Sequence, residues 1–190
     1  MVELYNHSKM ANLLFICYIT ILSNFITISH QTFSEELSEV ISINQIEKTT
    51  HLHFYFHDIV SGKNPTAIKV IGTNPYDFGA TSIFDDPLTE GPEPKSKIIG
   101  KAQGIYSITA QNDLALIMVM NFVFTERKYN GSSISVLGRN HVLDDVREMP
   151  ILGGTRLFRF ARGYALAHTF MFDIKTGDAT VEYNLFVKHY

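Results

Sequence analysis

An acidic residue on the apolar side of a predicted strand is the feature of this sequence that most directly suggests chemistry. Leu52, Phe54 and Phe56 alternate with polar residues in the stretch HLHFYFHD, and such alternation is typical of a half-buried strand. Asp58 ends this stretch and shares the parity of the three apolar residues. A buried carboxylate without a partner is costly, so it binds a cation or takes up a proton. Asp58 is therefore a candidate acid in an apolar cavity, unless a bulge at the strand end turns it into solvent.

Three histidines lie on the polar side of the same strand and raise the question of a metal site. A spacing of two residues between His51 and His53 is compatible with shared ligation. His57 lies too far along the strand from His51 to complete the same coordination shell. We therefore expect the three histidines to face solvent, and we expect no metal.

Several other polar motifs have a simple structural interpretation. Arg147 is surrounded by acidic residues in DDVREMP, which is typical of a solvated cation in a loop. Gly153-Gly154-Thr155 lacks the lysine of a phosphate-binding loop and is interpreted as a tight strand connection. Asp85-Asp86-Pro87 is interpreted as a turn.

Length and composition limit the architecture and the partners. A chain of 190 residues with 45% hydrophobic residues is enough for one domain with a substantial core. The formal net charge of −3 and the lack of a basic run argue against nucleic acid as a partner. A small, neutral partner is the better expectation.

The N-terminal sequence predicts export. Lys9 precedes an apolar stretch between Met10 and Ile28, which is typical of a secretory signal peptide; a membrane anchor is the alternative. We predict a signal peptide over residues 1–30 and a flexible, polar segment over residues 31–50. Cys17, the only cysteine, lies within the signal, so the mature chain has no disulfide.

A glycosylation motif is consistent with export. Asn130-Gly131-Ser132 fits the N-glycosylation pattern between two apolar runs, where a sugar would face solvent. Together with the N-terminal sequence it predicts a secreted glycoprotein of the extracellular space.

The remainder of the chain predicts an all-β fold. Short runs with strand periodicity are separated by Gly, Pro, Asn and Asp, and no stretch has helical spacing. Eight or nine such strands suggest an antiparallel barrel or a sandwich, and composition does not choose between them. The run from Leu114 to Thr125 is apolar on both faces, which suggests contact with another subunit. Besides this run and the first strand, the predicted strands are Thr66–Ile71, Gly79–Phe84, Ile98–Thr109, Ser132–Leu137, Leu157–Ala161, Tyr164–Asp173 and Ala179–Lys188.

Motifs from residue 53 onward resemble those of plant dirigent proteins. The resemblance is carried, in chain order, by HFYFHDI, FDDPLTEGP, GKAQGIYS, GRN, VREMPILGGT, FRFARGYA and TGDATVEYN. It implies an eight-stranded antiparallel β-barrel over residues 51–190, with a cavity at one end, assembled as a homo-oligomer (a trimer or a dimer).

The resemblance also implies roles for individual residues. Asp58 and Arg147 match residues implicated at the dirigent cavity, where a carboxylic acid donates a proton and a fixed cation orients a phenol. Tyr106 matches a position that lines this cavity and would steady the phenol, which makes it the third candidate catalytic residue. The candidate substrate-binding residues are Asn140, Thr169 and Tyr183.

One motif departs from the dirigent members that direct lignan coupling. Where those members have an aspartate in a GAD-like motif, this chain has Asn140 in GRN. An amide cannot transfer a proton as a carboxylic acid does. The departure argues against the pinoresinol-forming role.

The resemblance implies two alternative functions, neither of which uses a cofactor. The first is a secreted protein that imposes stereochemistry on the coupling of phenoxy radicals, for example from coniferyl alcohol. A protein without a redox centre cannot make radicals, so an external oxidase, a laccase or peroxidase, must supply them. The second is an enzyme resembling pterocarpan synthases, which cyclise isoflavan-4-ols through a quinone methide with loss of water. A non-catalytic binding protein is a third class.

Overall fold

The computed structural model describes residues 46–190. The predicted signal peptide and most of the predicted flexible segment lie outside the described residues. Among residues 46–190, no helix has the length and apolar character that a membrane crossing requires. The strands are β1 (Lys48–Asp58), β2 (Ala67–Ile71), β3 (Thr81–Thr89), β4 (Ile98–Ile108), β5 (Ala115–Phe124), β6 (Ser133–His141), β7 (Val146–Gly154), β8 (Arg162–Phe172) and β9 (Ala179–His189), with two 3-10 turns, η1 (Arg127–Tyr129) and η2 (Arg156–Phe158).

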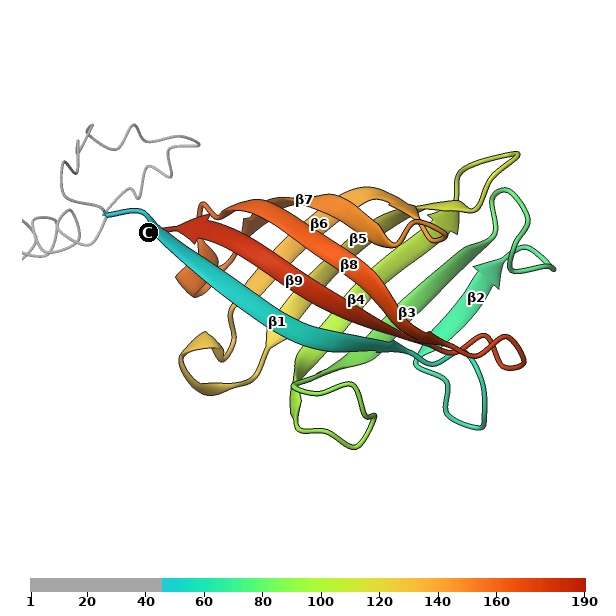
Figure 1. Cartoon of the computed structure of the whole chain (residues 1–190), viewed down its shortest axis with the longest axis horizontal. Coiled ribbons are helices and arrows are strands. Elements are labelled where there is room, and N and C mark those ends of the chain that lie inside the picture. The colour runs from blue at the N-terminus through green and yellow to red at the C-terminus, as the bar shows by residue number, and fades with distance from the viewer. Residues whose placement is uncertain (1–45) are drawn as a thin grey trace, which may run out of the picture. The chain divides into compact units, whose positions relative to one another are not determined.

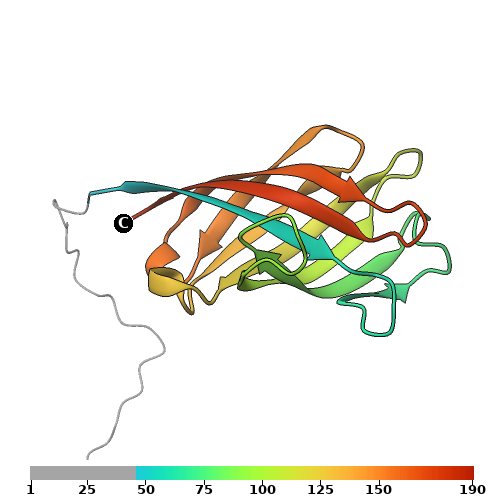
Figure 2. The ribbon, with the colours of Figure 1, turned by 60° about the horizontal axis from the view of Figure 1, so that its bottom comes forward.

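The strands form one antiparallel sheet that closes on itself (Figures 1 and 2). The strand order is β1-β9-β8-β7-β6-β5-β4-β3-β2, and β1 also pairs with β3. Eight strands, β1 and β3 to β9, make the barrel, while β2 extends from β3 as an extra strand. The predicted eight-stranded antiparallel barrel is confirmed, and closure satisfies most strand edges that a sandwich would expose.

The seam that closes the barrel is short. β1 pairs with β9 over its whole length, from Lys48 to Asp58. Its other edge pairs with β3 only at Tyr55, opposite Thr89, and at Phe56, opposite Leu88. Within residues 46–190, the first half of β1 therefore has a β-sheet neighbour on one side only.

Side-chain alternation places aromatic rings inside the barrel. Phe54 is fully buried, and its ring centroid lies 5.0 Å from that of Phe122 and 6.0 Å from that of Tyr183. Phe56 packs edge-on against Phe84 at 5.6 Å. Each such ring pair stabilises the fold by about 0.5–1.5 kcal/mol beyond the burial of its area. The predicted alternation of the first strand is confirmed, although β1 begins at Lys48, inside the predicted flexible segment.

Two predictions about residues 146–161 are wrong. Arg147 does not lie in a loop but on β7, a strand that the sequence reasoning missed. The predicted strand Leu157–Ala161 is instead the turn η2 and the loop after it. β7 was missed because its inward positions begin with a charged residue, Arg147, and its outward positions include Pro150, both of which argue against a strand by propensity.

The predicted turn at Asp85-Asp86-Pro87 is also wrong, because these residues lie in the middle of β3. On one side all three pair with β4. On the other side the neighbour of β3 changes from β2, which ends its pairing at Phe84, to β1, which begins its pairing at Leu88. Pro87 therefore lies where a backbone N–H is not needed on that side, which is where a strand tolerates proline.

Candidate functional site

Two carboxyl groups point into the barrel beside its closing seam. Asp86 is inward-facing on β3 and 0% exposed, and Asp58 is the half-buried last residue of β1. The antiparallel register that pairs Phe56 with Leu88 brings Asp58 level with Asp86, two residues further on. Within the described residues, Oδ1 of Asp58 and Oδ2 of Asp86 are buried without a hydrogen-bond partner. Such orphaned oxygens are costly in a folded protein, and they mark a position that a ligand hydroxyl can occupy.

Hydroxyl groups surround this carboxyl pair. Thr66, just before β2, donates a hydrogen bond to Oδ1 of Asp86. Tyr106 faces inward on β4 opposite Ser82, and its ring stacks on Phe84 with centroids 5.7 Å apart. Burial, and next the charge of Asp58, raise the pKa of the Tyr106 hydroxyl. Tyr106 therefore stays protonated and serves as a hydrogen-bond donor next to Asp58.

The environment raises the pKa of both carboxyl groups. Burial, together with the charge of Asp58, raises the pKa of Asp86 to about 8, although the Thr66 hydroxyl acts in the opposite direction. Burial raises the pKa of Asp58 to about 6, against the lowering effect of the Tyr106 hydroxyl. Because the groups interact, these values belong to the pair. Near neutral pH the pair holds one proton, so it contains one acid and one base.

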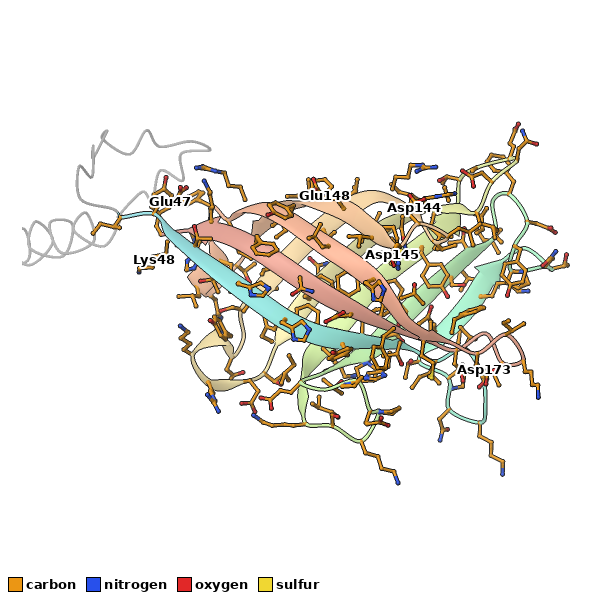
Figure 3. The ribbon with its side chains drawn as sticks, viewed as in Figure 1. Glu47, Lys48, Asp144, Asp145, Glu148 and Asp173 are labelled. Atoms are coloured by element: carbon orange, nitrogen blue, oxygen red, sulfur yellow. The ribbon has the colours of Figure 1, made fainter. Side chains whose placement is uncertain are left out.

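A buried cation lies on the neighbouring part of the barrel wall. Arg147 is only 5% exposed, and its Nε donates a hydrogen bond to Oδ1 of Asn140 at 3.1 Å. One terminal nitrogen also donates to the backbone carbonyl of Asp144 at 3.3 Å, in the β6–β7 hairpin that Figure 3 marks with Asp144 and Asp145. Asn140 thus holds the guanidinium without neutralising it, and the positive charge inside the barrel is preserved.

The hydroxyl of Tyr183 is influenced by both the carboxyl pair and Arg147. It faces inward on β9, is buried, and packs against Phe122 at 5.1 Å between ring centroids. Burial raises the pKa of its hydroxyl, the charge of Arg147 lowers it, and the charges of Asp58 and Asp86 raise it. The Tyr183 hydroxyl therefore experiences the charges of both the carboxyl pair and Arg147.

The structure brings together most of the predicted site residues. Asp58, Tyr106, Asn140, Arg147 and Tyr183 all lie on inward positions of the barrel. The alternative in which Asp58 turns into solvent does not hold, since its Oδ1 is buried. Thr169 is half-buried on β8 opposite Val181, at an inward position, but among residues 46–190 its side chain makes no hydrogen bond.

Sequence reasoning missed Asp86, the most deeply buried member of the site. A signal was present, because Asp86 shares the parity of Ser82, Phe84 and Leu88, all of which are buried. The prediction ended the strand at Phe84 and gave the following acidic pair and proline to a turn. Extension of the alternation by a few residues would have found this carboxyl group.

The three histidines of β1 have separate environments. On the outer face, Nε2 of His51 lies 2.8 Å from Oδ1 of Asn184, and Nε2 of His53 lies 2.6 Å from Oε1 of Glu182. The prediction that all three face solvent is wrong for His57, which is 2% exposed between Thr89 and Thr180. Within the described part of the chain, no three His, Cys, Asp or Glu side chains are arranged to share a metal ion.

The predicted glycosylation position is accessible. Asn130 is exposed in the loop after η1, and Gly131 follows it with a φ of +76°, a conformation that favours glycine. The side chain of Ser132, by contrast, is buried.

Comparison with protein families decides the family of this chain. Residues 49–188 match the family model described as dirigent-like protein. The chain belongs to the dirigent family.

The similar proteins within the family include both dirigent proteins and pterocarpan synthases. Dirigent protein 1 of Arabidopsis thaliana is 55% identical over 75% of this chain and 80% of its own length. Pterocarpan synthase 1 of Glycyrrhiza echinata is 48% identical over 84% of this chain and 88% of its own length. Among solved structures, the pterocarpan synthase dirigent protein PsPTS1 is 53% identical, with a TM-score of 0.73 over 77% of this chain and 98% of that chain.

Proposed function

We propose that this dirigent-family protein is an acid–base catalyst that dehydrates a phenolic alcohol to a quinone methide and then closes a ring. The observation that carries the proposal is the pair of interior carboxyl groups, Asp58 and Asp86, with pKa values of about 6 and about 8 and an orphaned oxygen on each. A pair that holds one proton provides the acid and the base that such a reaction needs.

The first half of the reaction removes water. The neutral carboxyl of Asp86 donates its proton to the benzylic hydroxyl oxygen, the carbon–oxygen bond breaks with its electron pair on oxygen, and water leaves. The carboxylate of Asp58 accepts the phenol proton, and the phenol oxygen becomes the carbonyl oxygen of a quinone methide. No electron is gained or lost overall, so the step needs no oxidant.

The second half closes the ring. A second phenol hydroxyl of the substrate forms a bond to the electrophilic carbon of the quinone methide, and its proton passes to Asp86. Asp58 returns its proton to the carbonyl oxygen, which becomes a phenol again. Both carboxyl groups are then in their starting states.

The remaining site residues bind and orient. Tyr106 donates a hydrogen bond beside Asp58, where the oxygen of the quinone methide develops negative charge. The Arg147 guanidinium, held by Asn140 at 3.1 Å, attracts a further oxygen of the substrate. The stacked rings of Phe84 and Tyr106 give a flat phenol an aromatic surface.

Similarity to the pterocarpan synthases supports this reaction class, because those relatives are about half identical over most of the chain. The isoflavan-4-ols that pterocarpan synthases cyclise are our proposed substrate class. Stereoselective coupling of phenoxy radicals is the second candidate, since the aromatic interior around Phe54, Phe122 and Tyr183 suits planar radicals. It requires radicals from an external laccase or peroxidase.

One experiment distinguishes the cyclisation function from the radical-coupling function. The purified mature protein is incubated with a racemic 2′-hydroxyisoflavan-4-ol without oxidant, and the products are resolved by chiral chromatography. We expect loss of water and formation of one enantiomer of the cyclised product. No conversion of this substrate, with an enantiomeric excess of dilignols when coniferyl alcohol and laccase are supplied, would instead support the coupling function.

We also propose that the protein is exported and glycosylated at Asn130. The apolar sequence before residue 30 and the exposed position of Asn130 support this. Expression in plant leaves should give apoplastic protein whose mass falls on treatment with a glycosidase, and Asn130→Gln should lack this change. A protein that stays in the cytosol and keeps its N-terminal residues would contradict the proposal.

We propose that the barrel assembles as a homo-oligomer through its outer face. Ile83, Ile105, Val119 and Leu137 are direct cross-strand neighbours on β3 to β6, and each side chain is 39–45% exposed. A continuous aliphatic row on the outside of a barrel is typical of a surface covered by a partner.

A further inference from the structure

A pocket lies away from the carboxyl pair. Its volume is about 280 Å³, and its apolar floor is formed by Leu52, Phe54, Ile99, Phe124 and Tyr129. It lies beside the first half of β1, whereas Asp58 ends that strand. Neither carboxyl of the proposed catalytic pair lines it. It shares Phe54 with the aromatic interior of the barrel, but it does not include the acid–base pair.

The pocket is lined by residues of two loops and by the edge of β1 that no described strand covers. Glu90 belongs to the β3–β4 loop, while Glu126 and Arg127 belong to the β5–β6 loop; both loops lie below β1 in Figure 1. His51 and His53 also line it, but their rings bind Asn184 and Glu182 on the outer face. We therefore infer that their backbone faces the pocket, on an edge of β1 that has no strand partner among residues 46–190.

The charged groups at the rim balance one another. Lys97 Nζ lies 3.1 Å from Glu90 and 2.8 Å from Glu126, and Arg127 Nε lies 4.0 Å from Glu126. Lys97 donates hydrogen bonds to Glu126 and Glu90, and these bonds raise the pKa of its ammonium group, which keeps it charged. Two carboxylates and two cations leave no net charge, so the rim favours a neutral ligand with hydroxyl groups that donate to carboxylates and accept from the guanidinium.

Arg127 is held in a strained conformation at this rim. Its φ is +47°, in the left-handed region, and its side chain is 83% exposed. A non-glycine residue in this region is disfavoured, and such strain gathers at binding sites. Arg127 also lines the pocket, and its exposed guanidinium is available to a ligand there.

We propose that this pocket binds a phenolic glycoside, with the aromatic ring on the apolar floor and the sugar hydroxyls at the charged rim. A volume of about 280 Å³ is near the lower limit of small-molecule sites, about 300 Å³, which suits a ligand with a single aromatic ring. Backbone groups on the edge of β1 that no described strand covers supply further donors and acceptors for the sugar. A bare phenol would leave the charged rim unused, and a bare sugar would leave the apolar floor uncovered.

Isothermal titration calorimetry with phenyl β-D-glucoside tests the proposal on the mature protein. We expect saturable binding, with phenol and methyl β-D-glucoside each at least about tenfold weaker. Equal affinity for phenol and for the phenyl glucoside would overturn the proposal, as would the absence of saturation at about 10 mM.

Four variants locate the binding. Glu90→Gln should weaken binding about tenfold, while Glu148→Gln, an exposed glutamate on β7 (Figure 3), should leave it unchanged. Arg127→Gly should weaken binding while the melting temperature stays equal or rises, because glycine adopts this φ without strain. Asp86→Asn should bind the glucoside normally. Loss of binding in Asp86→Asn, or none in Glu90→Gln and Arg127→Gly, would place the glucoside elsewhere and refute the proposal.

Discussion

Burial and the charge of Asp58 together raise the pKa of Asp86 to about 8, so one of the two carboxyl groups is still protonated near neutral pH. The two residues come from β1 and β3, which pair with each other only at the seam that closes the barrel. The same seam therefore completes the fold and assembles the acid–base pair, and it makes both stability and activity depend on pH.

The carboxyl pair should make the protein less stable as pH rises. Both pKa values are raised in the folded state, so the folded protein binds more protons than the unfolded chain, and stability falls between about pH 4 and pH 8. Asp86→Asn removes the larger part of this effect. At pH 8 we expect the free energy of unfolding to rise by ~2 kcal/mol or more, since each pKa unit corresponds to ~1.4 kcal/mol.

Asp85, the residue before Asp86, provides a matched control. Asp85 faces solvent and binds Lys101 and Gln103, and its pKa is lowered chiefly by the hydrogen bond from Lys101. Asp85→Asn should therefore give no gain in stability at pH 8. Chemical denaturation of the two variants from pH 4 to pH 9 measures the difference, and a gain in both would show that a general charge effect, not burial, is responsible.

The positions that sequence reasoning found and missed have a common physical explanation. The alternation around Phe54 and Phe56 predicts a strand because burial acts on neighbouring residues of one strand. Asp86 and Arg147 lie at inward positions although their side chains are ionisable, because they hydrogen-bond to residues outside their own strands, Thr66 and Asn140. Local propensity contains no information about such partners, so it assigned both charged residues to turns or loops.

His57 should stabilise the closing seam only while it is neutral. Thr89 Oγ1 donates to the backbone carbonyl of Gly91 at 2.7 Å and so accepts from Nε2 of His57 at 2.7 Å. Nδ1 then accepts from Thr180 Oγ1 at 3.2 Å. A proton on Nδ1 would break this chain, and burial indeed lowers the pKa of His57.

The contribution of His57 to stability changes with pH in the direction opposite to that of the carboxyl pair. Because the pKa of His57 is lower in the folded state, its contribution is present above the unfolded value of about 6.5 and is lost as pH falls further. His57→Ala should cost ~2 kcal/mol at pH 8 and less at pH 5, as measured by urea denaturation. An equal loss at both pH values would show that His57 contributes only by packing.

The outer aliphatic row should control assembly. Val119→Glu places a charge at the centre of this row, where burial against a second copy would be costly. We expect light scattering after gel filtration to show the monomer mass for this variant and an oligomer for the parent protein. Asn121→Asp, on the same face of β5, is the control and should keep the oligomer. A monomeric parent protein would exclude this assembly.

The pH dependence of the cyclisation rate, compared between the parent protein, Asp86→Asn and Asp85→Asn, tests the central claim most directly. For the parent we predict a bell-shaped profile with limbs near the pKa values of about 6 and about 8. Asp85→Asn should keep this profile, whereas Asp86→Asn should lose at least about 100-fold in rate and the alkaline limb. An Asp86→Asn variant with the parent's rate and both limbs would contradict the assignment of the interior carboxyl pair as the acid and base of the reaction.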